Sequence, residues 1–291
     1  MANKNPNWVD EFESKGYAVI EDFSTSEECD EMKAEMYRVL NELEITAEHM
    51  AVFSSSDEEK FEASKWDYFF KSAGKVRYFF EKDALKEDGT LTVPKDRSIC
   101  KVALALHWHN EVFKRFSFSN KMKSLAHDLG YKKPAVVESV YLFNNPGSGA
   151  HDHHQDGGTF WMEPMKLCGL FLALDDADEK TGCMWFIPES HRESKPELPM
   201  IKQEDDNGVI SLKPGDYRFY ADTSKFTPCP AKKGSLVLIH GLVVHKNNNN
   251  ETNEPKNAYT MHLVEQEGTT WSPDNWLQST EELPFNPLYS N

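Results

Sequence analysis

The chain has 291 residues, a net charge of −16, and a composition that is 39% hydrophobic and 12% aromatic. The apolar content is sufficient for a large buried core, and the negative charge argues against a nucleic-acid partner or an anionic membrane surface. No apolar run approaches the length of a membrane span. Length alone would allow about two domains, but β-rich chains of this size often form one. We therefore expect a single domain over residues 1–291.

The cysteines are odd in number, widely spaced and free of any Cys-x-x-Cys pair: Cys29, Cys100, Cys168, Cys183 and Cys229. This pattern predicts a reducing compartment, with neither a disulfide framework nor a cysteine-based zinc site. The N-terminal residues do not form a basic-then-apolar leader, and the final residues do not form a peroxisomal address. We therefore expect a cytosolic protein.

The N-terminal part, about residues 1–133, is expected to be rich in helices. Tyr17–Ile20 predicts a short strand, and Ser24–Glu27 resembles a capping box at the start of a helix. A second helix is expected over Ser119–Leu129, where Gly130 would end it. The polar stretch 54–60 is expected to be a loop. The apolar face of the first helix would carry Met32, Met36, Val39, Leu40 and Leu43.

From about residue 134 to 291 the pattern changes to short strands separated by turns. The expected strands are Ala135–Phe143, Gly169–Leu174, Cys183–Ile187, Ser235–Ile239, Leu242–His245 and Ala258–Val264. The acidic segment 203–215 and the polar tract 247–250 are expected to be loops. A strand-rich part wrapped by N-terminal helices predicts a mostly β protein with a double-stranded β-helix, a jelly roll of the cupin kind.

A His-x-Asp pair, His154 and Asp156, is the main chemical signal of this strand-rich part. In an extended segment, residues two apart point to the same side, so both side chains can reach one ion. His245 lies 89 residues beyond Asp156, after an apolar run that reads as a buried strand. Two histidines and one carboxylate form the facial triad that binds non-haem Fe(II) and leaves the opposite positions open. We interpret all three as metal ligands and catalytic residues.

The histidines around this pair permit a simpler interpretation. The run 151–156 reads His-Asp-His-His-Gln-Asp, and such a cluster could be a surface patch that scavenges zinc. Only His154 is followed by a carboxylate two positions later, which favours the facial triad.

Several longer motifs resemble the phytanoyl-CoA dioxygenase family. Residues 182–191, Gly-Cys-Met-Trp-Phe-Ile-Pro-Glu-Ser-His, preceded by Ala-Leu-Asp-Asp-Ala at 173–177, are similar to its signature strand pair. The segments 154–156 and 240–245 match its iron motifs, and the run from 268 to 285 is similar to the C-terminus of animal members. The resemblance extends from about Phe12 to the end of the chain.

This resemblance implies a double-stranded β-helix, Fe(II), 2-oxoglutarate as co-substrate, and O2. Decarboxylation of 2-oxoglutarate to succinate and CO2 would be coupled to hydrogen abstraction from a small-molecule substrate. The outcome would be hydroxylation, desaturation or oxidative ring closure. Halogenases of this general type replace the carboxylate ligand with Gly or Ala, so Asp156 favours these outcomes over halogenation.

The resemblance also implies a co-substrate pocket. Lys256, eleven positions after His245, matches a basic residue of the family, usually Arg, that binds the far carboxylate of 2-oxoglutarate. A lysine keeps the positive charge but cannot form the bidentate hydrogen bonds of an arginine guanidinium. Lys101 matches a second lysine of the family, and Phe171 stands where the family has a pocket tryptophan. Further co-substrate positions are matched by Val140, Gln155 and Asn247.

Two aromatic residues follow the His-x-Asp pair, and we expect them to line the substrate side of the iron. Phe160 and Trp161 offer large rigid surfaces there, although core packing would explain them as well.

Several alternatives remain open at this stage. The substrate could be an acyl-CoA, as the family name suggests, or an amino-acid-derived or other metabolite modified by a biosynthetic tailoring enzyme. The lysine at position 256 also fits a jelly roll that binds a metal or ligand without turnover. Zinc accepts two histidines and a carboxylate, so a zinc hydrolase is a third hypothesis. The sequence does not indicate an oligomeric state.

Overall fold

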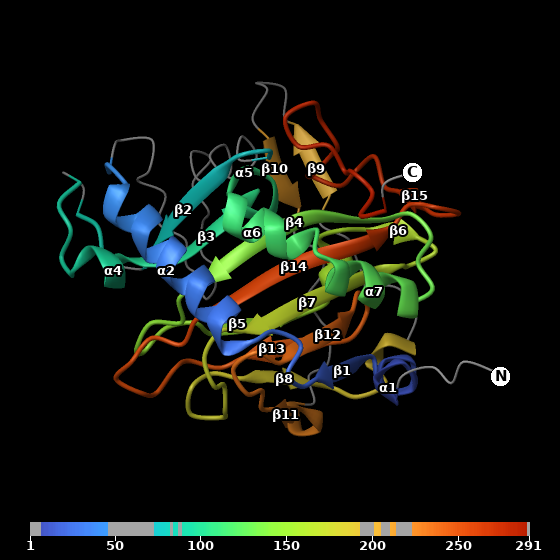
Figure 1. The fold of residues 1–291 in the computed structure, drawn as a ribbon, viewed down its shortest axis with the longest axis horizontal. Helices are drawn as coiled ribbons and strands as arrows, with labels where there is room; N and C mark the ends of the chain where they lie inside the picture. The colour runs from blue at the N-terminus through green and yellow to red at the C-terminus, as the bar shows by residue number, and fades with distance from the viewer. Residues whose placement is uncertain are drawn as a thin grey trace.

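The computed structural model describes residues 7–45, 73–81, 84–86, 89–192, 201–204, 210–213 and 223–289, apart from the side chains of 201–204 and 210–213 (Figure 1). The described helices are α1 (Asn7–Lys15), α2 (Ser26–Glu42), α4 (Lys95–Ser98), α5 (Leu106–His109), α6 (Glu111–Ser117) and α7 (Asn120–Asp128), with 3-10 turns η2 (Asp156–Gly158), η3 (Ser190–Arg192) and η4 (Thr223–Lys225). The described strands are β1 (Tyr17–Ile20), β2 (Val76–Phe80), β3 (Ile99–Leu104), β4 (Pro134–Leu142), β5 (His151–His154), β6 (Met162–Glu163), β7 (Leu167–Ala173), β8 (Met184–Phe186), β9 (Ile201–Glu204), β10 (Ile210–Lys213), β11 (Thr227–Cys229), β12 (Leu236–His240), β13 (His245–Asn247), β14 (Ala258–Glu265) and β15 (Thr270–Trp271).

Antiparallel pairing joins these strands into two main sheets. Within the described residues, the larger sheet has the order β1-β12-β7-β14-β4-β3-β2, and a four-stranded sheet has the order β11-β8-β13-β5. Two-stranded pairs β10-β9 and β15-β6 complete the set. Non-consecutive neighbours such as β7 and β14 require long crossings between the sheets, which is the connectivity of a jelly roll. The predicted mostly β, cupin-like architecture is confirmed.

The outer face of the larger sheet is covered by helices. Figure 1 shows α2, α6 and α7 across this face, and apolar residues of all three pack with it in one buried cluster. From the helices the cluster takes Met32, Met36, Leu40, Phe113, Phe116, Met122 and Leu125, and from the strands Tyr141, Leu170, Leu172, Tyr259 and Met261. Alternate strand residues therefore face the helices, and those between them face the interior. No described helix is both long enough and apolar enough to span a membrane.

The inner face of the larger sheet packs against the four-stranded sheet. One cluster combines Phe171, Ala173, Val237 and Ile239 of the larger sheet with Met184, Phe186 and Cys229 of the smaller one. Tyr17 of β1 also stacks on Phe186 of β8, with ring centroids 4.1 Å apart. Strands such as β7 are buried on both faces, which explains their continuous apolar sequence.

Most expected elements are confirmed to within one or two residues. Tyr17–Ile20 forms β1, and α2 buries Met32, Met36 and Leu40 as predicted. The second helix is α7, with Ser119 as its N-cap, and Gly130 adopts a positive φ of 75° directly after it. The expected loop at 54–60 lies outside the described residues.

Four details of the expectations are corrected. The capping box uses Thr25 and Glu28, one residue later than expected. The predicted strand Leu242–His245 begins only at His245, because the amides of Leu242 and Val243 bond to His240 in a tight turn. The loop expected at 247–250 starts after Asn247, which ends β13. The segment expected to be a loop at 203–215 contains β10 and the end of β9, and these two strands pair antiparallel. The alternation Ile210-Ser211-Leu212-Lys213 is a strand pattern that the surrounding acidic residues obscure.

Candidate metal centre

His154 and His245 are brought together by the pairing of β5 with β13. The two residues are opposite each other in the register, and their ring centroids are 4.3 Å apart. Asp156 is the first residue of η2 rather than part of the strand, which corrects the expectation. Because Gln155 is still extended (φ −123°, ψ 133°), Asp156 nevertheless reaches the same side as His154. The three ligand atoms lie within 4.8 Å of one another.

The tautomers of both histidines follow from their backbone contacts. His154 Nδ1 lies 2.8 Å from the carbonyl of Asp152, and His245 Nδ1 lies 3.0 Å from the carbonyl of Val243. A carbonyl only accepts, so each Nδ1 carries a hydrogen, and in the neutral form of each ring Nε2 presents a lone pair. Burial lowers the pKa of His245 to about 4, so this imidazole is neutral at pH 7.

These lone pairs point at a carboxylate oxygen. Asp156 Oδ1 is 3.7 Å from His154 Nε2 and 3.5 Å from His245 Nε2. In this neutral form all three atoms are acceptors, and a cation placed among them satisfies them together. The residues therefore fit a metal ion with two nitrogen ligands and one oxygen ligand.

Access to this centre is from one side. The side chain of His154 is 35% exposed, whereas those of Asp156 and His245 are 10% and 4% exposed. A molecule that reaches the metal would therefore approach past His154, while Asp156 and His245 form the floor.

Close backbone packing holds Asp156 in place. The amide of Gly157 donates to the carbonyl of Gly241 (2.7 Å), which joins the segment of the His-x-Asp pair to the segment that leads to His245. Below the carboxylate, a Cβ added to Gly169 would lie 2.5 Å from Asp156 Oδ2. Only glycine at position 169 leaves room for the carboxylate.

Two residues that the sequence analysis missed lie behind this carboxylate: the half-buried His262 contacts it, and the buried Glu138 contacts His262. His262 Nε2 of β14 lies 3.5 Å from Asp156 Oδ2, and His262 Nδ1 lies 2.7 Å from Glu138 Oε2 of β4. Burial lowers the pKa of His262, but the charges and hydrogen bonds of Asp156 and Glu138 outweigh it and raise the pKa to about 10. Burial likewise raises the pKa of Asp156, but the imidazoles of His245 and His262 hold it well below its usual range. A signal for this pair was present in the sequence: Glu138 and His262 each interrupt a mainly apolar strand, β4 and β14, with an ionisable side chain.

Two of the expected co-substrate residues line the interior of the larger sheet. Phe171 on β7 is 5% exposed and lies between Val237 and Thr260 in the register. Val140 on β4 lies between Thr260 and Ala103. Both therefore belong to the inner face that encloses the centre.

The two expected lysines differ in their surroundings. Lys101 on β3 is half-buried, with Nζ 5.1 Å from the ring centroid of Phe79, and burial lowers its pKa. Burial, followed by the charge of Lys101, lowers the pKa of His151 at the start of β5 to about 3. Lys256 is half-buried, two residues before β14, and its backbone amide donates to the carbonyl of Asn144 (3.2 Å).

The two expected amide side chains are engaged by backbone carbonyls. Gln155 Nε2 donates to the carbonyl of Leu242, and Asn247 Nδ2 donates to the carbonyl of Gly149. Both amides thus join the loops around the centre. The Oε1 atom of Gln155 is buried and has no hydrogen-bond partner.

The expected substrate residues occupy different positions. Phe160 is 2% exposed and packs on His262, with ring centroids 4.8 Å apart, which favours a core role behind Asp156. Trp161 is half-buried, and its backbone amide and carbonyl bond to the Asn275 side chain, each at 2.8 Å.

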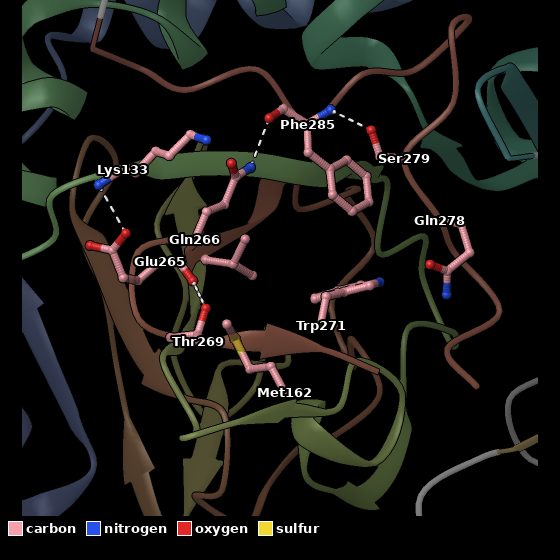
Figure 2. Close-up of a pocket in the computed structure, with 10 residues that line it drawn as sticks. Lys133, Met162, Glu265, Gln266, Thr269, Trp271, Gln278, Ser279 and Phe285 are labelled. Atoms are coloured by element: carbon pink, nitrogen blue, oxygen red, sulfur yellow. Dashed lines mark hydrogen bonds between the residues drawn. The ribbon is translucent and has the colours of Figure 1, made fainter. Parts of the chain in front are cut away.

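A pocket of about 450 Å³ lies beside Trp271 (Figure 2). Its wall residue Trp271 stacks on Phe160 at 5.9 Å. The polar groups of the pocket largely bond to the chain itself: Gln266 Nε2 donates to the carbonyl of Phe285, and Glu265 accepts from the amide of Lys133. The lining residues are Lys133, Met162, Val264, Glu265, Gln266, Thr269, Trp271, Gln278, Ser279 and Phe285. None of these lining residues belongs to the His154–Asp156–His245 centre.

Comparisons with known proteins agree with this geometry. The mouse protein named "Phytanoyl-CoA dioxygenase domain-containing protein 1" is 39% identical over 293 residues, covering 100% of both chains. The fold resembles the epimerase SnoN in complex with Fe3+, alpha ketoglutarate and nogalamycin RO (TM-score 0.64, 15% identity, 98% of this chain and 95% of that chain). It also resembles EctD from S. alaskensis with 2-oxoglutarate and 5-hydroxyectoine (TM-score 0.59, 15% identity, 91% of this chain and 78% of that chain).

The family assignment rests on the sequence match. The model described as Phytanoyl-CoA dioxygenase (PhyH) matches residues 12–258, which include all three residues of the metal centre. This match confirms the resemblance inferred from the motifs, and the chain belongs to the phytanoyl-CoA dioxygenase family.

Proposed function

We propose that this protein is an Fe(II)- and 2-oxoglutarate-dependent oxygenase that acts on a small molecule. His154, Asp156 and His245 would hold Fe(II). The observation that carries the proposal is the convergence of two imidazole Nε2 atoms on one carboxylate oxygen, at 3.7 and 3.5 Å, with each Nδ1 bonded to a backbone carbonyl. A divalent cation satisfies all three atoms, and the ligand set is that of a facial triad.

Family membership and the neighbours that bind iron and 2-oxoglutarate support this assignment. When bound, Fe(II) with 2-oxoglutarate supplies oxidation by O2. The chain itself would orient both imidazoles through backbone carbonyls, keep Asp156 ionised and bury the floor of the site against water. The exposed side of His154 leaves space for a substrate to approach.

The far carboxylate of 2-oxoglutarate requires a cation, and we assign this role to Lys256, with Lys101 as the alternative. Family alignment supports Lys256. The position of Lys101 near His151 and on the inner side of β3 supports the alternative. Phe171 and Val140 would form apolar walls, since both lie on the inner face.

For the prime substrate we favour a metabolite of a biosynthetic tailoring reaction over an acyl-CoA, because Phe171 and Lys256 both depart from the family pattern. The expected compartment is the cytosol, and a reducing environment is supported by five free cysteines, four of them buried.

The test is consumption of 2-oxoglutarate by purified protein reconstituted without oxygen and then exposed to air. Succinate formation with Fe(II) but not with Zn(II) is the expected result. Activity with Zn(II) alone would favour a hydrolase, and metal binding without any succinate over a broad metabolite screen would favour a binding protein.

A further inference from the structure

Three residues in one row across the larger sheet lie behind the carboxylate of Asp156. In the register, His262 on β14 is opposite Glu138 on β4 and opposite Gly169 on β7. Directly opposite residues point to the same face of a sheet. The side chains of Glu138 and His262 therefore project together into the interior, and glycine leaves the space that Asp156 fills from η2.

The two oxygens of Asp156 face different partners. Oδ1 faces His154 Nε2 and His245 Nε2, as described above. Oδ2 faces His262 Nε2 at 3.5 Å and lies over Gly169. The carboxylate is thus divided between a metal-facing oxygen and an oxygen that faces the protein.

The imidazole of His262 is held in this orientation on several sides. Its Nδ1 bonds to Glu138 Oε2 at 2.7 Å, and the ring of Phe160 packs against it with centroids 4.8 Å apart. The side chains of His262 and Glu138 are only 16% and 9% exposed. Little water competes for these contacts, so the pair can restrain the carboxylate strongly.

We propose that Glu138 and His262 are positioning residues that retain Oδ2 of Asp156, so that Asp156 binds the metal through Oδ1 alone. The inference rests on the function proposed above. A carboxylate that used both oxygens would occupy a further coordination position, which the co-substrate and O2 need in a facial-triad site. Groups that orient a ligand from behind in this way commonly change metal affinity by about 10- to 100-fold when they are removed.

The test is anaerobic titration with Co(II) alone, followed by calorimetry and visible absorption. His262→Leu is expected to weaken Co(II) binding by about 10- to 100-fold. It should also change the d–d absorption, because the released oxygen can then bind the metal. His262→Gln, whose amide can still donate to Oδ2, should restore most of the affinity, and Glu138→Gln should fall between the two. His107→Asn is the matched control, since His107 is 1% exposed and lies outside the centre.

The variants distinguish a failure of the positioning role of Glu138 and His262 from a failure of the proposed metal site. Unchanged Co(II) affinity and an unchanged spectrum in both His262→Leu and Glu138→Gln would overturn the inference while leaving the metal site intact. If circular dichroism showed His262→Leu to be unfolded, Glu138→Gln would decide, because it preserves size and hydrogen bonding. Wild-type Co(II) affinity in Asp156→Ala would contradict the proposed function, and the inference with it.

Discussion

His154 and His245 are direct cross-strand partners, although they lie far apart in the chain. The pairing of β5 with β13 sets their ring separation of 4.3 Å, and the extended Gln155 adds Asp156 to the same side. The ligand set therefore depends on strand register, because a shift by one residue would turn a side chain to the opposite face.

The first prediction concerns the co-substrate cation. Lys256→Ala is expected to weaken 2-oxoglutarate binding by about 30- to 1000-fold, or about 2–4 kcal/mol, because a partly buried carboxylate loses its positive partner. Lys256→Arg should keep or improve binding if the pocket accepts the larger group. The apparent KM for 2-oxoglutarate in a succinate assay measures both effects.

Lys101→Ala is the comparison for this experiment. A large effect of Lys101→Ala together with no effect of Lys256→Ala would transfer the role to Lys101.

The second prediction concerns the glycine below Asp156. Gly169→Ala is expected to weaken Co(II) binding and to lower the free energy of unfolding by about 1–3 kcal/mol, because the new Cβ overlaps the carboxylate. Gly158→Ala is the matched control, since a Cβ there meets nothing within 4 Å. Calorimetric titration and denaturant unfolding of both variants are the measurements, and equal behaviour of the two would refute the packing argument.

The third prediction concerns stability against acid. Burial lowers the pKa of His107 to about 3, from 6.5. Between these values the unfolded chain binds a proton that the folded chain does not, so stability falls as the pH falls below about 6.5. His107→Asn removes this group, and the slope of unfolding free energy against pH should decrease by up to about 1.4 kcal/mol per pH unit.

Denaturant unfolding at several pH values between about 4 and 7 measures this slope. Identical slopes for the wild type and His107→Asn would mean that His107 has the same pKa in the folded and the unfolded chain, which would contradict the prediction.

The fourth prediction separates the two aromatic residues after the His-x-Asp pair. Phe160→Ala is expected to lower the free energy of unfolding by about 3–5 kcal/mol, since the ring packs among His262, Trp271 and Trp276. Trp161→Ala, at a half-buried position, should cost less stability and should raise the KM of the prime substrate. Denaturant unfolding and steady-state kinetics measure these effects, and an effect of Trp161→Ala on stability alone would make it a packing residue.

The sequence alone could predict which three residues form the candidate metal centre, because same-face spacing and a distal histidine after a buried strand are local patterns. It could not predict the Glu138–His262 pair, since that contact depends on which residues of β4 and β14 are opposite, and strand register is not visible in one sequence. The pairing of β9 with β10 was missed because its acidic surroundings outweighed a short alternation. The turn at 241–243 replaced an expected strand because its amides bond to His240 rather than to a neighbouring strand.

The central claim is most directly tested by metal content. Protein reconstituted with Fe(II) without oxygen and then desalted should hold one iron per chain. His154→Ala, Asp156→Ala and His245→Ala should each lose the iron, while His153→Ala, the adjacent histidine that lies outside the three-residue centre, should retain it. Equal loss in His153→Ala and His154→Ala, or full retention in Asp156→Ala, would instead indicate a histidine patch that binds metal without the carboxylate.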